Sequence, residues 1–360
     1  MSRYDSLRIT PDRNRGRWGQ CVNNPTTSVR SVSVIVPTYN RYERLLRVVD
    51  ALEAQDVGDR DYEIVIVSDG SSDGTDEKVP PQLSERARLL TQPNGGPAVA
   101  RNTGIEASTG ELLVFIDDDV VPEPHCVRTH IEIHEASAER RVVIGPLLTP
   151  TTVELSPYVT WEQRMLYKQY DAMAEGHYSA TARQFYTGNA SMRRSLLDEF
   201  GGFDPAFRRA EDVELGYRLA NAGVPFEFEM GAEAYHFAER SFDSWLGIAS
   251  AYGRNDVLFW RDGGQAWLIP RIRDEYESRH VLNRLVTRIG VTVPGVASLM
   301  EAVAKPVIER GSRRRPNFGQ RLLSALYSVR YYKALAEELG SMADFLAIEP
   351  LTHADANPES

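Results

Sequence analysis

The chain has 360 residues, of which 42% are hydrophobic and 26% are charged, as in a globular enzyme with one large domain or a domain plus an appendage. Its net charge of -10 argues against binding nucleic acid through overall positive charge, so no nucleic-acid partner is expected. Two cysteines, Cys21 and Cys126, are too few for a disulfide framework or a zinc site. A reducing compartment such as the cytoplasm fits this usage.

Residues 1–30 are polar and Arg-rich and lack the apolar core of a signal peptide, so they are predicted to form a flexible arm. No run reaches the roughly 18 apolar residues of a transmembrane helix. The nearest candidate, residues 291–304, is interrupted by Pro294 and Gly295. This segment is predicted to be either a core helix or an interfacial helix.

Strand and helix patterns alternate through the first third of the chain. Residues 31–36 are a β-branched apolar run, and residues 41–55 carry Leu and Val on one helical stripe. Further strands are predicted at 62–67, 87–90 and 112–116, and a helix at 98–107. Alternation of this kind predicts an α/β fold with a doubly wound parallel sheet, covered by helices on both faces.

In such a sheet, ligands bind at the carboxyl ends of the strands. Three of these ends are polar here, at residues 37–40, 68–70 and 117–119, so a binding site is predicted along one edge. The loop after the first strand lacks the Gly-x-Gly-x-x-Gly pattern of dinucleotide-binding folds, which disfavours NAD binding.

The apolar run 112–116 ends in three consecutive acids, Asp117, Asp118 and Asp119. Adjacent carboxylates repel one another unless a cation lies among them. If the backbone stays extended past Ile116, Asp117 and Asp119 point to one side and Asp118 to the other. Two oxygen ligands with open positions suit Mg²⁺ or Mn²⁺ shared with a phosphorylated ligand. The alternative is an acidic turn after a core strand.

The regular alternation stops after residue 148. A helix is predicted at 156–175, with aromatic residues that serve either core packing or carbohydrate stacking, and a short strand at 185–192. Beyond residue 240 the chain is predicted to be mainly helical, at 245–260 and 321–346.

Two later features admit both a structural and a functional interpretation. Glu211, Asp212 and Glu214 begin a helix, where acids complement the helix dipole, but Asp212 or Glu211 could also accept a proton from a nucleophile. His236 lies on a short strand-like segment, either as a packed residue or as a further ligand of the cation at Asp119.

Basic residues are concentrated near the C-terminus. Residues 305–333 include eight Lys and Arg but only one acid, Glu309. This segment is either a solvated surface or a docking site for an anionic membrane, an acidic acceptor or a second subunit.

Six motifs, taken in order, resemble those of family 2 inverting glycosyltransferases with the GT-A fold. They are residues 34–41, 67–74, 96–104, 115–119, 187–190 and 211–214. The resemblance covers residues 31–240, about two thirds of the chain. It implies a Rossmann-like, mostly parallel sheet with nucleotide-sugar binding at about 31–120 and an acceptor side at about 121–240, followed by a mainly helical region at 241–360.

The resemblance also implies a role for each matched residue. The base and ribose would be framed by Pro37, Thr38, Tyr39, Asn40 and Asp69, and Arg101 would lie near the nucleotide or diphosphate. The ribose and metal would lie by Asp117 and Asp118, and Mn²⁺ or Mg²⁺ would be bound by Asp117, Asp119 and His236. The donor sugar would lie over Gly188 and Asn189, and the catalytic base would be Asp212, beside Glu211. Many members carry two acids where this chain has Ser68 and Asp69, which leaves base recognition open.

The implied activity is metal-dependent, inverting transfer of a sugar from a nucleotide-diphosphate sugar to an acceptor hydroxyl. UDP is favoured over dTDP or GDP by the family's habits. A saccharide, a lipid-linked glycan, a small molecule or a protein could be the acceptor, as in bacterial polysaccharide or glycoconjugate biosynthesis. The enzyme would be cytoplasmic, with the option of peripheral contact at the inner face of the membrane. Two alternatives are a non-catalytic nucleotide-sugar binding protein and a sugar-phosphate nucleotidyltransferase.

Overall fold

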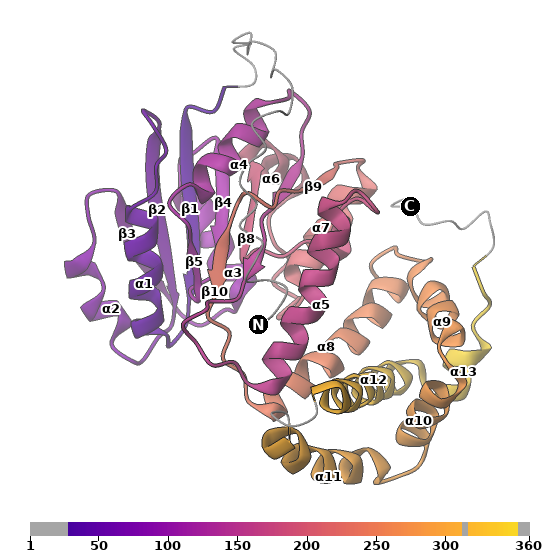
Figure 1. The fold of residues 1–360 in the computed structure, drawn as a ribbon. Coiled ribbons are helices and arrows are strands. Elements are labelled where there is room, and N and C mark those ends of the chain that lie inside the picture. Colours follow the sequence, from indigo (N-terminus) through magenta and orange to yellow (C-terminus); the bar gives the residue numbers. More distant parts are fainter. Residues whose placement is uncertain (1–27, 312–315, 352–360) are drawn as a thin grey trace.

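A seven-stranded sheet forms the centre of the N-terminal two thirds of the molecule (Figure 1). The structure is a computed structural model that describes residues 28–311 and 316–351. The strand order is β3-β2-β1-β4-β8-β6-β9. The strands are β1 (Ser31–Thr38), β2 (Asp61–Asp69), β3 (Ala87–Gln92), β4 (Leu112–Ile116), β6 (Val142–Ile144), β8 (Asn189–Arg193) and β9 (Phe226–Phe228).

The expected parallel arrangement is confirmed for β1 to β4, and β6 pairs in parallel with β9. Only β8 runs against its neighbours, since it pairs antiparallel with both β4 and β6. This strand is shorter than the predicted segment 185–192, because residues 187 and 188 form a turn and β8 begins at Asn189.

Helices cover both faces of this sheet. They are α1 (Tyr42–Glu53), α2 (Thr75–Lys78), α3 (Pro97–Ala107), α4 (Cys126–Glu135), α6 (Arg194–Phe200) and α7 (Glu211–Asn221). Side chains of β1 alternate between two cores: Val34 and Val36 pack with α1 and α4, whereas Ile35 packs with α3, α6 and α7. Val29 is also buried, so the packed domain begins before the predicted boundary at residue 31.

A second, three-stranded sheet adjoins the acidic end of β4. It has the order β5-β10-β7 and consists of β5 (Val120–Pro122), β7 (Leu147–Leu148) and β10 (Ala234–His236). In its antiparallel register, His236 lies opposite Val120, the residue after Asp119. The small sheet therefore brings a residue from late in the sequence to the aspartate cluster.

The remaining helices, which are α5 and those that follow residue 241, gather on one side of the main sheet (Figure 1). They are α5 (Pro157–Ala174), α8 (Phe242–Arg261), α9 (Leu268–Ser278), α10 (Val281–Thr292), α11 (Val296–Gly311), α12 (Pro316–Leu339) and α13 (Met342–Ala347). The single helix predicted at 321–346 is two helices, because Gly340 adopts a φ of 107° that ends α12. Likewise, Pro294 and Gly295 divide the segment 291–304 between α10 and α11.

Candidate active site

A cavity of about 1100 Å³ lies between the carboxyl ends of the parallel strands and the helices α5, α7, α8 and α12. Of the residues predicted to form the site, those that line it are Pro37, Thr38, Tyr39, Asp69, Arg101, Asp117, Asp118, Asp119, Gly188, Glu211, Asp212 and His236. Asn40 and Asn189 are not among the lining residues. Residues spread over 200 positions of sequence thus converge on one space.

The backbone does not stay extended past Ile116, so the arrangement expected for an extended strand, with Asp117 and Asp119 on one side and Asp118 on the other, does not apply. β4 ends at Ile116, and the backbone turns, with the Val120 amide donating to the Asp117 carbonyl at 3.0 Å. As a result Asp118 and Asp119 share one partner, Arg41, whereas Asp117 pairs with Arg101.

Asp119 lies between a cation and an imidazole. Its Oδ2 accepts from Arg41 Nη1 at 2.6 Å, and its Oδ1 lies 3.5 Å from His236 Nε2. Burial opposes ionisation of this carboxyl, but His236 and Arg41 outweigh burial and lower its pKa to about 2. Asp119 is therefore a carboxylate at neutral pH, able to serve as an anionic ligand.

Asp118 is more deeply enclosed than Asp119. Its two oxygens accept from Arg41 Nη1 at 2.9 Å and from the Thr38 hydroxyl at 2.8 Å. Burial raises its pKa to about 6 despite the charge of Arg41. Arg41 was not assigned a role from the sequence, although it follows Asn40 in the first motif; only the fold shows that it bridges two of the three aspartates.

Arg101 joins the two acidic clusters. Its Nη2 donates to Asp117 Oδ1 at 2.8 Å and its Nη1 to Glu211 Oε1 at 2.6 Å, while its guanidinium lies over the Phe203 ring at 5.6 Å. The Arg101 and Glu211 side chains are only 5% and 8% exposed, so this is a buried ion pair. Burial alone would lower the pKa of Arg101, but the neighbouring acids raise it.

Asp212 is carried into the cavity by the first turn of α7. The preceding residue, Ala210, has a φ of 60°, an uncommon left-handed conformation for a residue with a side chain. Burial and the negative charge of Glu211 raise the pKa of Asp212 to about 7, against the opposing effect of Arg101. Its Oδ1 accepts from the Val213 amide at 2.8 Å, and among residues 28–311 and 316–351 no cationic side chain donates a hydrogen bond to it. A carboxyl with these properties can exchange a proton near neutral pH.

Asp69 is held by the Gly-rich turn before α3. Its Oδ1 accepts from the Gly95 amide and from Gln92, and its Oδ2 accepts from the Gly96 amide, all within 2.8 Å. Oδ2 retains acceptor capacity for a donor group in the cavity. Asn40 has a left-handed backbone conformation, and its side-chain Oδ1 accepts from the Ser72 amide at 2.7 Å, so it joins the loops after β1 and β2.

Asn189 does not line the cavity and instead stabilises the packing behind it. Its side chain is fully buried, its amide nitrogen donates to the carbonyls of Pro146 and Ala232, and its Oδ1 lies 3.0 Å from His130 Nε2. These bonds tie β8 to both sheets and thereby position Gly188. A Cβ on Gly188 would lie 3.1 Å from Asp117 Oδ2, which leaves little room for any other residue there.

The far wall of the cavity comes from the C-terminal helices, whose polar residues the sequence did not reveal. Asp256 of α8 lies 3.8 Å from Arg183 and accepts a hydrogen bond from Tyr331 of α12. Tyr252, also on α8, is 48% exposed toward this space. No short motif marks these residues; only the packing of α8 against α12 brings them together.

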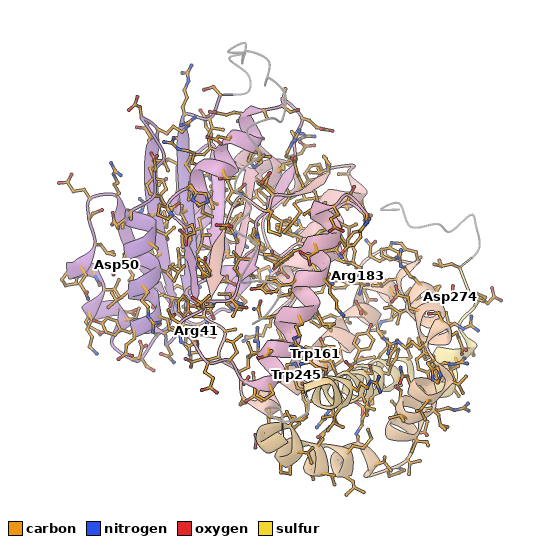
Figure 2. All side chains as sticks on the ribbon, in the orientation of Figure 1. Arg41, Asp50, Trp161, Arg183, Trp245 and Asp274 are labelled. Atoms are coloured by element: carbon orange, nitrogen blue, oxygen red, sulfur yellow. The ribbon has the colours of Figure 1, made fainter. Side chains whose placement is uncertain are left out.

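The aromatic residues of α5 mainly serve packing. Trp161 and Trp245 lie edge to face with centroids 5.6 Å apart, and both appear at the junction of α5 with the C-terminal helices (Figure 2). Trp161 also reaches the cavity wall. Of the two roles predicted for the aromatic residues of α5, core packing therefore applies to most of them, rather than carbohydrate stacking.

Asp119 and His236 are the residues best placed to hold a divalent cation. A carboxylate oxygen and an imidazole nitrogen 3.5 Å apart are both donors that Mn²⁺ accepts, and Arg41 contacts the other carboxylate oxygen. Within residues 28–311 and 316–351, no group of three His, Cys, Asp or Glu side chains is arranged to hold a metal, and Asp117 faces Arg101 instead. The pair fits a cation whose other ligands come from a phosphorylated molecule and water.

Comparison with known proteins shows similarity to glycosyltransferases. Residues 33–201 match the model of Glycosyl transferase family 2. Validoxylamine A glucosyltransferase of Streptomyces hygroscopicus subsp. limoneus is 30% identical over 61% of this chain and 58% of its own length. Glycosyltransferase AglE of Haloferax volcanii is 28% identical over 69% of this chain and 77% of its own.

A solved structure, the mannosyltransferase PcManGT from Pyrobaculum calidifontis in complex with GDP-Man and Mn²⁺, superposes with a TM-score of 0.58. It is 22% identical and covers 88% of this chain and 91% of its own, so it supports the fold. The chain spans little more than half the length of its first curated relatives. With a sheet of the GT-A type and relatives that are glycosyltransferases, residues 33–201 of this chain form a glycosyl transferase family 2 region.

Proposed function

We propose that this chain transfers a sugar from a nucleotide-diphosphate sugar to an acceptor hydroxyl, with inversion and with the help of a divalent cation. The observation that carries the proposal is Asp212, a carboxyl with a pKa near neutrality that shares one cavity with Arg101 and the Asp119–His236 pair. A proton acceptor and a set of diphosphate-binding groups thus face the same space.

On the donor side, Tyr39 and Asp69 are available to the base and ribose, and a uracil ring with its donor N–H suits the free acceptor capacity of Asp69 Oδ2. Thymine and guanine also carry a ring N–H, so the choice of UDP over dTDP or GDP rests on the family resemblance, and UDP is the nucleotide we propose. Gly188 lines the cavity beside Asp117 and would lie under the donor sugar. Asp119 and His236 would hold Mn²⁺ or Mg²⁺ against the diphosphate.

In the transfer step, an acceptor hydroxyl attacks the anomeric carbon on the face opposite the diphosphate, and the bond to the leaving oxygen breaks. Asp212 receives the proton of this hydroxyl as the new bond forms. Arg101 holds the acids around Asp212 in place. A bound divalent cation would supply positive charge to the leaving diphosphate. Direct displacement of this kind inverts the anomeric centre.

The acceptor would enter from the side of the C-terminal helices. We assign residues 31–120 to donor binding, residues 121–240 to the acceptor side and residues 241–360 to a helical part that completes the cavity wall, since Tyr252, Asp256 and Tyr331 line it. The paired Arg183 and Asp256 offer both donors and acceptors to a hydroxyl-rich acceptor. A cytoplasmic site of action is consistent with the use of a nucleotide sugar.

The experiment that tests the proposal is release of nucleoside diphosphate from a panel of UDP-, GDP- and dTDP-sugars with Mn²⁺, with and without simple glycoside acceptors. We expect one UDP-sugar to be turned over, and NMR of the product to show the opposite anomeric configuration from the donor. Binding of a nucleotide sugar without any turnover would make the chain a binding protein, and a retained configuration would exclude direct displacement.

The rate should depend on the ionisation of Asp212. Because the base acts only when deprotonated, kcat/KM is expected to rise with pH up to about 7 and then level off, falling about tenfold for each pH unit below that value. Initial rates at low donor concentration between pH 5 and 9 measure this limb. A profile that is flat across this range would remove Asp212 from the role of base.

Metal affinity should depend on Asp119 and His236. Asp119→Asn and His236→Ala are each expected to weaken Mn²⁺ binding about 10- to 100-fold, as measured by calorimetric titration in the presence of UDP. Glu239→Gln is the matched control, since this exposed acid lies just beyond β10 and pairs with Arg44. Equal Mn²⁺ affinity in all variants would show that the cation binds elsewhere.

A further inference from the structure

We propose that the paired helices α10 and α11 dock onto an anionic lipid membrane and lie in the plane of its interface. This inference goes beyond the transfer reaction and does not depend on it. It concerns the α10–α11 apolar face, defined by eight exposed aliphatic residues: Val281, Leu282, Leu285, Ile289, Val293, Leu299, Val303 and Val307. Their exposed fractions range from 42% to 66%, and other large hydrophobics with such exposure in the described residues are the tyrosines Tyr39, Tyr178 and Tyr252.

The exposed residues follow the helical period. On α10, Leu282, Leu285, Ile289 and Val293 are three or four residues apart, and on α11 the exposed aliphatics recur every four residues from Leu299. Each helix thus presents one continuous apolar stripe to solvent. Contiguous apolar patches of this kind on a protein surface mark a contact with another apolar phase.

Both helices already bury their opposite sides against the rest of the molecule. Gly290 of α10 packs against Val329 of α12, where a Cβ would approach within 2.8 Å. Ala304 and Ile308 of α11 pack with Leu323 and Leu326 of α12. The apolar face is therefore additional to the core, and covering it requires something outside the described residues.

The geometry favours a helix pair lying on the membrane. In the described part of the chain, no single helix is long and apolar enough to cross a bilayer. Residues 281–292 and 296–309 have the length and hydropathy of a membrane-spanning segment only when they are taken together, and the two helices are bent by 116° relative to each other. Amphipathic helices with a separate buried side settle at the level of the head groups rather than across the bilayer.

The charge pattern favours anionic lipid as the partner. Between residues 281 and 333 the sequence has ten Lys and Arg and only two acids, Glu301 and Glu309, in a chain whose net charge is -10. Four of these basic residues form ion pairs within the protein: Arg284, Lys305, Arg330 and Lys333. Arg288 is exposed beside Ile289, and Arg321 is exposed at the start of α12. Two copies of this face would bring like charges together, whereas anionic head groups attract them. The cluster Arg313–Arg315 predicted to contribute lies outside the described residues.

The test is sedimentation of the full chain with vesicles of phosphatidylcholine alone or with one third phosphatidylglycerol. We expect binding to the anionic vesicles, weaker at high salt, and at least about a tenfold loss of binding in Leu285→Asp/Ile289→Asp. The matched control is Ser195→Asp/Ala138→Asp, which adds the same charge at exposed positions of the sheet domain. Nucleoside diphosphate release from a soluble donor should be unchanged in both double variants.

Three results would overturn the inference. They are no binding to anionic vesicles, equal loss of binding in the two double variants, and a concentration-dependent dimer in solution that Leu285→Asp/Ile289→Asp dissociates without any lipid binding by the parent chain. Circular dichroism of each variant checks that the helices remain folded. None of these outcomes bears on turnover, so the docking proposal and the proposed function fail independently.

Discussion

Asp212→Asn is expected to lower kcat by about 10²- to 10⁴-fold while leaving donor binding nearly unchanged, because the amide cannot accept the proton of the acceptor hydroxyl. The measurement is nucleoside diphosphate release at saturating donor and acceptor, with the donor Kd from calorimetry. Glu214→Gln is the control, since Glu214 belongs to the same helical turn but pairs with Arg218 at 2.7 Å outside the cavity wall. Equal activity of the two variants would exclude Asp212 as the base.

Asp212→Asn is also expected to be more stable than the parent protein at alkaline pH. The pKa of Asp212 is about 7 in the folded state, well above the roughly 3.9 of an unfolded Asp. The folded state therefore binds more protons between these values, and stability falls as pH rises through this window. The Asp212 side chain is partly exposed, and part of its raised pKa comes from repulsion by Glu211. We therefore expect Asp212→Asn to increase the free energy of unfolding by about 1–2 kcal/mol at pH 8 and by little at pH 4.

Thermal unfolding of Asp212→Asn at both pH values measures this difference. A Tm that is higher than the parent's at pH 8 and converges with it at pH 4 agrees with the sign derived above. A lower Tm at pH 8 would mean that the carboxylate is stabilised by the fold, which is inconsistent with a raised pKa.

Arg101→Met is expected to be the most destabilising single change at the site. It would leave Glu211 buried without its cationic partner and Asp117 without its ion pair, at a cost of about 3–5 kcal/mol in the free energy of unfolding. Arg271→Met is the control: Arg271 pairs with Glu275 on the surface of α9, where both side chains are more than 40% exposed, and loss of that pair should cost less than about 1 kcal/mol.

Urea unfolding gives both values. The double variant Arg101→Met/Glu211→Gln should recover part of the lost stability, because the unpaired buried carboxylate is then removed. If Arg101→Met cost no more than Arg271→Met, the Arg101–Glu211 pair would not hold the two acidic clusters together.

The strands of the donor side could be predicted from the sequence because their signals are local. The β-branched runs around Val34 and Val65 and the buried run ending at Ile116 each specify a strand without reference to the rest of the chain. The convergence of strand ends at one edge then follows from parallel pairing alone. Of the twelve predicted site residues that line the cavity, seven lie at these strand ends: Pro37, Thr38, Tyr39, Asp69, Asp117, Asp118 and Asp119.

The remaining features depend on contacts between distant segments. The turn at Asp117–Val120 repositions Asp118 toward Arg41, and a period-two pattern carries no information about where a strand ends. Asn189 was assigned to the sugar through its motif, but its amide bonds the carbonyls of Pro146 and Ala232 because β8 of the main sheet lies close to the segments that lead into β7 and β10. The antiparallel direction of β8 and the far wall around Asp256 are likewise set by tertiary packing.

We propose that Asp119 and His236 hold a divalent cation against a nucleotide diphosphate within reach of Asp212. A crystal grown with MnCl₂ and UDP, with diffraction measured at the manganese absorption edge, locates both the cation and the nucleotide. We predict an anomalous peak within bonding distance of Asp119 and His236, with the diphosphate in the cavity on the same side as Asp212. A manganese peak away from Asp119, or a nucleotide bound outside the cavity, would contradict the account.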